Sequence, residues 1–310
     1  MPEATQQKMT IEPVAKVRPI DYLAIITAAA LWGGSFASTK IALAQADAIM
    51  IIWLRFLISI PPLVLGTWYS RALRFPTKKE AIPLFLMGFQ GIFFHQTIQA
   101  YAMRTAGAAN GNWVMVASPA LVSILGWIFL KEKISKTGIV GLVLSALGVA
   151  LVLALGTIKS AAFAGFGSMG DMILIFSVFN WAAFLIISRK VLRHDLPPSF
   201  TILWEMVAAL ICASIFLVAT RADFSQIASY NATTWKSILF LGIFSSALAY
   251  LFWFHGLSKL PVARVVIFQF IQPLAGIFVS YFFVGERFTI WLYLGGLLII
   301  SGVWLVNKKH

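Results

Sequence analysis

The stretch PALVSILGWIFLKEKIS, residues 119–135, is matched later in the chain by PLAGIFVSYFFVGERFT, residues 273–289. Both begin with proline, continue through eleven mostly apolar or small residues, and reach a glutamate thirteen positions after the proline. A basic residue and then a hydroxyl residue follow the glutamate in each. The offset of 154 residues also relates, without gaps, these flanking pairs: Gly88 and Gly242, Ala102 and Gly256, Ala109 and Ala263, Gly141 and Gly295, Gly148 and Gly302, Val149 and Val303.

Earlier matches support a duplication of the whole chain. Trp32 pairs with Trp181 at an offset of 149 residues, and Trp53 pairs with Trp204 at 151, so two short insertions account for the drift. Chance matching among glycine-rich apolar segments is the alternative, but eight matches at one offset within about sixty residues argue against it. The sequence therefore predicts two copies of one unit, at residues 21–156 and 168–306, joined by a linker at 157–167.

Composition places this duplicated chain in a membrane. Of its 310 residues, 60% are hydrophobic and 11% charged, whereas soluble domains carry about 45–50% apolar and about 25% charged residues. The apolar residues form continuous runs of about 17 to 25, the length of a helix that crosses a bilayer. We expect an all-α integral membrane protein with ten transmembrane helices, at about 21–44, 48–69, 81–103, 107–130, 138–156, 168–189, 199–219, 234–256, 261–284 and 290–306.

The basic residues indicate the orientation of the chain. The formal net charge is +13, but these residues lie in short loops between apolar runs, which argues against nucleic acid as a partner. If the first helix starts inside, 17 of the 24 Lys and Arg residues fall on the cytoplasmic side. We therefore predict a multi-pass protein of the inner membrane, with cytoplasmic tails at residues 1–20 and 307–310.

Five helices per copy is an odd number, so the second copy must enter the membrane from the opposite side. Two inverted copies imply a pseudo-two-fold axis in the membrane plane, an arrangement that secondary transporters use for alternating access around a central site. Pro119 and Pro273 fall in the middle of their predicted helices, where each is expected to kink the helix and shape a cavity. The alternative is the general abundance of proline in membrane helices.

Several segments resemble one transporter family. They are LWGGSFASTKIAL at 31–43, Arg55-Phe56, the doubled proline-to-glutamate element, GLVLSALGV at 141–149 and GLLIISGV at 296–303. In order and spacing, over about residues 21 to 306, the chain resembles the ten-helix EamA-type members of the drug/metabolite transporter superfamily. The resemblance implies a proton- or gradient-linked permease, commonly one that exports amino acids or related metabolites. Related four-helix multidrug exporters carry an acidic residue in the middle of their first helix, and this chain has none there.

Polar side chains inside predicted membrane helices are the candidates for substrate binding, because burying them in lipid is costly. At about 100° per residue they fall on common stripes with small residues. The alternative is that small residues and amides serve helix packing alone, and that tryptophans act as packing or interface anchors rather than stacking on a substrate. The substrate-binding candidates are His95, Gln99, Asn112, Gln269, Gln272, Trp32, Trp181 and Trp253.

Three ionisable side chains within the predicted membrane helices are candidates for coupling transport to the movement of an ion. His95 titrates near neutral pH, although a single histidine is more often a structural hydrogen-bonding group. Glu205 is suited to proton uptake, or else to pairing near the cytoplasmic face. Arg55 is suited to binding an anionic group such as a substrate carboxylate, or else reaches outward to the interface. Glu132 and Glu286, at helix ends, are interpreted as groups that set the register of the next helix rather than as proton carriers.

The sequence favours a secondary active transporter that exports a small metabolite, with a zwitterionic amino acid or amino-acid-like compound as the favoured substrate. A proton-coupled multidrug exporter of bulky apolar cations is the first alternative, and a non-transporting membrane scaffold is another. We expect no cofactor and no metal, because the sequence shows neither a nucleotide-binding loop nor metal-ligand spacing. An enzyme is disfavoured, because the ionisable groups lie at scattered depths. The single cysteine, Cys212, allows no intrachain disulfide.

Overall fold

The computed structural model describes residues 17–106, 114–115, 117–132, 134–155, 168–192, 196–276 and 290–307. Within these ranges every secondary-structure element is a helix, which confirms the expected all-helical class. The predicted linker at 157–167, Glu286 and most of the N-terminal tail lie outside the described residues.

Most of the described helices lie in the predicted ranges. Up to residue 155 they are α1 (Pro19–Gly33), α2 (Ser35–Ala42), α3 (Ala48–Tyr69), α4 (Lys78–Met87), η1 (Gly88–Phe94), α5 (His95–Ala102), α7 (Ser118–Leu130) and α8 (Lys136–Leu155). From residue 168 they are α9 (Met169–Leu192), α10 (Pro198–Ala219), η2 (Phe224–Ser229), α11 (Ala232–Leu239), η3 (Phe240–Leu248), α12 (Ala249–Lys259), α13 (Val262–Val266), η4 (Ile267–Phe270) and α15 (Ile290–Asn307).

Six helical stretches in the described residues are long and apolar enough to cross a membrane: Pro19–Ala42, Ala48–Tyr69, Lys78–Ala102, Met169–Lys190, Pro198–Ala219 and Ala232–Lys259. Shorter apolar helices occupy the remaining predicted spans, so ten crossings stay a prediction. Large apolar side chains such as Leu65, Trp68 and Trp304 are more than half exposed, as expected for surfaces that face lipid.

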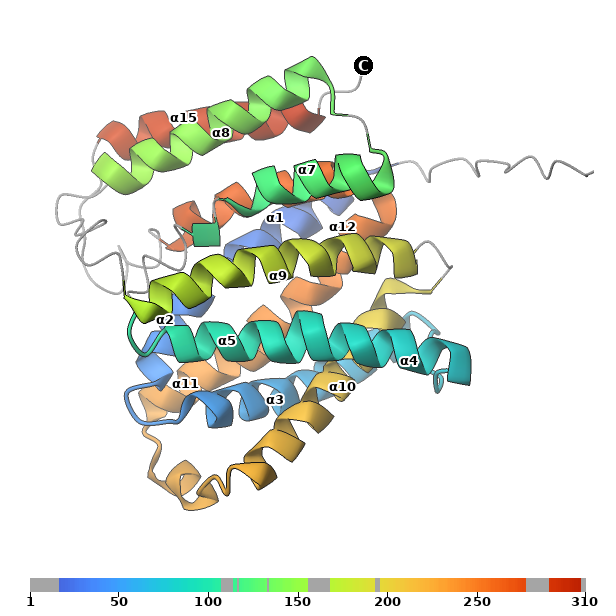
Figure 1. Ribbon diagram of the computed structural model, residues 1–310, viewed down its shortest axis with the longest axis vertical. Helices are drawn as coiled ribbons and strands as arrows, with labels where there is room; N and C mark the ends of the chain where they lie inside the picture. Colours follow the sequence, from blue (N-terminus) through green and yellow to red (C-terminus); the bar gives the residue numbers. More distant parts are fainter. Residues whose placement is uncertain are drawn as a thin grey trace, which may run out of the picture.

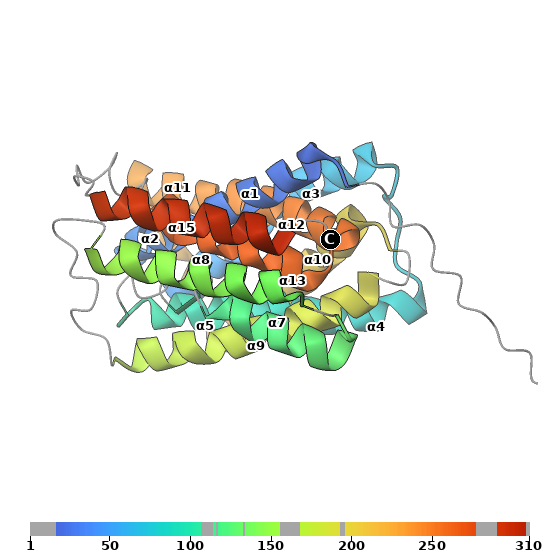
Figure 2. The same ribbon diagram turned by 90° about the horizontal axis from the view of Figure 1, so that it is seen from above.

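Helix contacts repeat between the two parts of the chain. The third segment, α4–η1–α5, is contacted by α9 and α10, and its counterpart α11–η3–α12 is contacted by α1 and α3. Three other equivalent pairs contact each other directly: α3 packs on α10, α7 packs on α13, and α8 packs along α15 (Figures 1 and 2). Exchanging the two parts therefore preserves the packing, which is the pattern that a two-fold relationship produces.

Glycines set the contact between α8 and α15. A Cβ added to Gly141 would lie 2.5 Å from the Gly302 carbonyl oxygen, and one added to Gly148 would lie 2.6 Å from the Gly295 carbonyl oxygen. The lower-numbered glycine of each helix thus meets the higher-numbered glycine of the other, so the helices are antiparallel. Midway, the Ser145 hydroxyl donates to the carbonyl of its repeat counterpart Ile299 at 3.2 Å. Small residues allow this close backbone approach.

Both middle segments contain a π-helical stretch at matching positions. Residues 88–94 in η1 correspond at the offset of 154 to residues 242–248 in η3. Each stretch includes a glycine at a close contact: a Cβ on Gly88 would lie 2.8 Å from Ala208 Cβ, and one on Gly242 would lie 2.6 Å from Ile58 Cγ2. The wider turns bring these two segments against α10 and α3, respectively.

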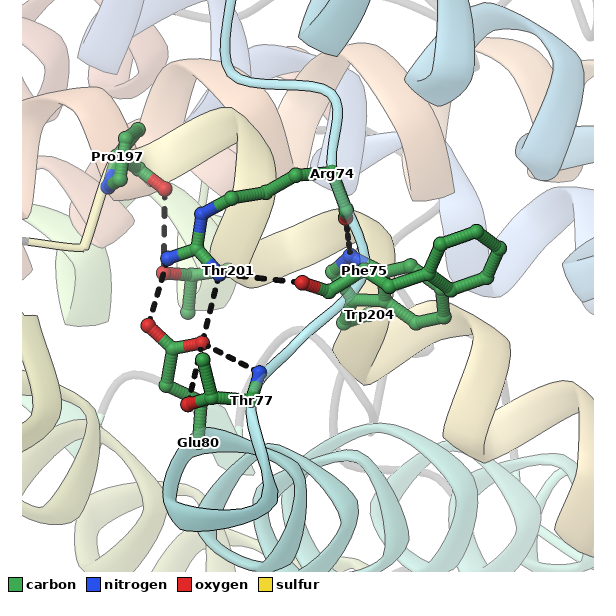
Figure 3. Close-up of polar contacts among 7 residues, drawn as sticks. All are labelled: Arg74, Phe75, Thr77, Glu80, Pro197, Thr201 and Trp204. Carbon is green, nitrogen blue, oxygen red and sulfur yellow. Dashed lines mark hydrogen bonds and ion pairs between the residues drawn. The ribbon is translucent and has the colours of Figure 1, made fainter.

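A polar cluster fastens the connection between α3 and α4 to α10 (Figure 3). Arg74 forms a two-pronged ion pair with Glu80 at 2.6 and 2.7 Å, which raises the pKa of the Arg74 guanidinium. Glu80 also accepts from the Thr77 backbone N–H at 2.8 Å, completing a helix N-cap. The Trp204 indole donates to the Arg74 carbonyl at 3.0 Å. This connection is thereby held against the neighbouring helix.

The prolines differ in part from the prediction. Pro119 lies in the first turn of α7, where its missing N–H breaks no helical hydrogen bond, so it starts a described helix rather than kinking one in the middle. Pro273 lies inside a helical stretch, and the four residues Ile267–Phe270 just before it form a 3-10 turn. An irregular turn before a proline is expected, because the ring disturbs the preceding turn.

Candidate functional site

A small cavity of about 30 Å³, lined mainly by buried side chains, lies where the two parts of the chain meet. Elements of both parts contribute to it, with α1, α2, α3 and α5 on one side and α9, α12 and η4 on the other. Its wall combines aromatic rings with amides and one guanidinium. The lining residues are Trp32, Ser35, Phe36, Arg55, His95, Gln96, Gln99, Met115, Trp181, Tyr250, Gln269 and Gln272.

Most of the predicted binding residues come together here. Trp32, His95, Gln99, Trp181, Gln269 and Gln272 all line the cavity, as does the coupling candidate Arg55. Trp253 does not line it and instead packs behind Trp32, with ring centroids 4.9 Å apart. Asn112 lies outside the described residues. Six of the eight predicted binding residues therefore line the cavity, and Trp253 packs against one of them.

Aromatic rings form one wall of the cavity. The Trp32 ring lies 5.5 Å from that of its repeat counterpart Trp181 and 5.2 Å from that of Tyr250. His95 stacks on Trp181 with centroids 5.1 Å apart. The Trp32 indole donates to the Ser245 carbonyl at 3.0 Å, which fixes the ring. Edge-to-face contacts of this kind give a rigid surface with little side-chain freedom.

Gln96 and Tyr250 line the cavity but are not among the residues predicted from the sequence. The Gln96 amide donates to the Tyr250 hydroxyl at 2.9 Å, and the two residues are 154 apart, so they occupy equivalent positions in the two copies. The repeat offset was the available signal, because equivalent residues on a two-fold axis must meet. This pair joins the two parts of the chain at the cavity wall.

Three lining side chains carry buried polar atoms without a hydrogen-bond partner among the described residues: Gln272 Oε1, His95 Nδ1 and Trp181 Nε1. Other amides in the wall are satisfied. Gln269 accepts from the Ser118 hydroxyl at 2.7 Å, and Gln99 donates to the Ser177 hydroxyl at 3.2 Å. An unpaired buried polar atom costs about 1–3 kcal/mol, so a ligand or water that supplies the partners is favoured at this wall.

The glycines of Trp32-Gly33-Gly34 place α1 next to Gln272. A Cβ on Gly33 would overlap the Gln272 carbonyl oxygen and lie 2.8 Å from Ala275 Cβ. Only glycine allows this backbone approach, which holds the residues around Gln272 beside the Trp32 ring.

Arg55 is the one charged side chain in the described lining of the cavity, and it is 3% exposed. Its Nη2 donates to Ser245 Oγ at 3.1 Å, and its Nε donates to Ser246 Oγ. Burial of this side chain excludes the outward-reaching arrangement considered from the sequence.

Comparisons with known proteins agree with this architecture. The sequence profile of the EamA-like transporter family matches residues 20–154 and again residues 168–308. The chain belongs to the EamA-like transporter family. The two matched segments confirm a two-repeat domain, and together with the apolar helices they make the chain a multi-pass membrane protein. Membership of a transporter family also fits the expectation that the chain is not an enzyme.

Proteins with sequences similar to this EamA-like chain are named as transporters. An uncharacterized transporter of Archaeoglobus fulgidus is 26% identical over 90% of this chain and 94% of its own length. A probable amino-acid metabolite efflux pump of Escherichia coli is 23% identical over 89% of this chain and 90% of its own. A protein of known crystal structure, 15% identical, superposes with a TM-score of 0.73 over 94% of this chain and 98% of its own, which shows a shared fold.

Glu205, the remaining coupling candidate, is not among the described residues that line the cavity of this EamA-like protein. It is fully buried on α10, and neither carboxylate oxygen has a hydrogen-bond partner within the described ranges. Its backbone faces η1, where Gly88 allows the close approach. An ionised carboxylate in such a place is costly, so a neutral acid is favoured there. A coupling role for Glu205 stays a prediction.

Proposed function

We propose that this chain is a secondary active transporter that exports a small metabolite by alternating access, with an amino acid or amino-acid-like compound as the favoured substrate. The observation that carries the proposal is the cavity between the two parts of the chain, whose wall holds unpartnered polar atoms on Gln272, His95 and Trp181. A ligand with both hydrogen-bond donors and acceptors would satisfy them. The protein would lie in the inner membrane with both ends in the cytoplasm.

The chemistry of the lining supports a zwitterion over a bulky cation. The residues that line the cavity, as far as the structure describes it, include no aspartate or glutamate. A site for apolar cations would gain most from a carboxylate, as ion recognition in a desolvated pocket generally does. The name of the Escherichia coli relative points in the same direction.

The proposal is tested by counterflow in liposomes that contain the purified full-length protein. Saturable exchange of radiolabelled amino acids is the expected result. Exchange of ethidium-like dyes without amino-acid exchange would favour the multidrug alternative. Absence of any solute flux would favour a scaffold.

Gln272→Ala is expected to raise the KM for exchange by about tenfold or more while the protein still folds. The reason is that Gln272 Oε1 is unpartnered in the cavity, and one hydrogen bond to a charged ligand group contributes about 1.5–3 kcal/mol. Gln90→Ala is the matched control, because the Gln90 amide bonds to Asn180 at 3.0 Å outside the cavity lining. Equal changes in KM for both variants would contradict a binding role for Gln272.

A further inference from the structure

Arg55 presents to the cavity a buried positive charge that has no ion-pair partner among the described residues. The described residues offer it no carboxylate within 4.0 Å, since the ion pairs found there involve Arg74, Arg104, Arg189 and His255. Its two hydrogen-bond acceptors are neutral serine hydroxyls. A buried cation without a counter-charge nearby is strongly disfavoured, so a bound molecule that carries a negative charge would stabilise this site.

The geometry leaves part of the guanidinium open to such a molecule. Nε and Nη2 are engaged by Ser246 and Ser245, consecutive residues of η3, whereas Nη1 has no hydrogen-bond partner in the part of the chain that the structure describes. Arg55 lines the main cavity and also the smaller space beside it that Thr39, Ile52 and Met103 help to enclose. The serines therefore fix the group from one side while its Nη1 end remains available to a ligand.

The geometry points to Arg55 as the residue that binds a carboxylate of the transported substrate. The substrate class is thus an organic carboxylate, either zwitterionic or anionic, and cations that lack an acidic group are excluded. Guanidinium and carboxylate match in a planar two-pronged contact, which is stronger than a neutral hydrogen bond. This inference rests on the proposed transport function and adds the chemical group that the site selects.

The remaining cavity wall fits the rest of such a substrate. Trp32, Trp181 and Tyr250 offer apolar surface for a side chain, and Gln272 Oε1 is an acceptor for an ammonium group. With one fixed cation and several neutral amides, the site matches a molecule that carries one negative group and further donors.

The test compares carboxylates with their amides on purified full-length protein. The unfolding temperature in detergent is measured with each of the twenty common L-amino acids, with a panel of simple monocarboxylates, and with the matched carboxamides. The expected result is stabilisation by at least one carboxylate, with its amide about a hundredfold weaker in apparent Kd. Arg55→Gln should bind the acid and the amide with similar, weak affinity. Arg55→Lys, which keeps the charge but loses the planar fork, should retain part of the preference.

Several results would overturn the inference. They are equal stabilisation of the wild-type protein by acids and amides, no stabilisation by any carboxylate, or an unchanged preference for acids in Arg55→Gln. If Arg55→Gln does not fold, a Ser246→Ala variant replaces it and should weaken acid binding more than amide binding; equal weakening counts against the inference. Stabilisation by chloride alone, measured against gluconate, would indicate an inorganic counter-ion instead.

Counterflow in liposomes separates this inference from the proposed function. Acid-selective binding without solute flux would remove the transport proposal and leave the role of Arg55 intact. Flux of acids and amides at equal rates would support the transport proposal and contradict the role of Arg55.

Discussion

Gly302→Leu is expected to separate α8 from α15 and to lower the unfolding temperature of the purified protein by about 6 °C or more. A Cβ at this position would overlap the Gly141 carbonyl oxygen and Ser145 Oγ and would lie 2.8 Å from the Ser145 backbone nitrogen. Because two of these atoms belong to the backbone, no rotamer change relieves the overlap. Overpacking of this kind costs about 1–3 kcal/mol and occasionally more, and leucine adds three carbons beyond the Cβ.

Gly296→Leu is the matched control for this prediction. Gly296 lies on the same helix, yet a Cβ there meets no described atom within 4 Å. The same substitution should therefore leave the unfolding temperature nearly unchanged, apart from a small gain in helix propensity. Similar losses in both variants would show that the helix tolerates no large side chain anywhere, and that the glycine contact with α8 is not what matters.

The α8–α15 contact illustrates what the sequence could predict. The offset of 154 residues makes Gly141 equivalent to Gly295 and Gly148 equivalent to Gly302. In the structure the two helices are antiparallel and cross near Ser145 and Ile299, so Gly141 meets Gly302 and Gly148 meets Gly295. The repeat predicts which glycines are equivalent, and the structure adds the point at which the two helices cross.

Helical periodicity does not predict all of the side chains that line the cavity. The prediction of Trp253 as a substrate-binding residue assumes a stripe of side chains along its helix at about 100° per residue. The π-helical turns of η3 lie across that stripe and change the angular position of every later side chain. As a result Tyr250 faces the cavity and Trp253 packs behind it. The apolar sequence at 240–248 contains no pattern that predicts a π-helix, because tertiary packing determines where such wider turns form.

Glu132 belongs to the first of the two matching stretches, residues 119–135. Its side chain links three helices at one end of the bundle. Its carboxylate accepts from the backbone N–H groups of Val262 at 3.2 Å and Ala263 at 3.4 Å, at the start of α13. It also lies 4.0 Å from Nε of Arg189 on α9, whose Nη1 donates to the Leu257 carbonyl near the end of α12. The glutamate is thus a helix-end group, as the sequence indicated, but it caps a helix of the other copy rather than the next helix.

Glu132→Ala is therefore expected to destabilise the folded protein by about 2 kcal/mol. The substitution removes a charged cap from two N–H groups and leaves the partly buried Arg189 without this carboxylate. Reversible unfolding in mixed detergent micelles measures the loss. Because Glu132 and Arg189 act on each other, the loss in the double variant with Arg189→Ala should fall short of the sum of the single losses by about 1 kcal/mol.

Lys40→Ala supplies the control for that cycle. Lys40 is the repeat counterpart of Arg189, and its ammonium donates to the Met103 carbonyl at 2.7 Å and the Ala106 carbonyl at 3.0 Å, at the end of α5. The C-terminal end of α5 lies at the opposite end of the bundle from the C-terminal end of α7 (Figure 1). Loss of Lys40 should therefore add to loss of Glu132 within about 0.5 kcal/mol. A coupling as large as that with Arg189 would mean that the two ends are linked through the whole fold, and that the Glu132 contacts are not a local tie between the two copies.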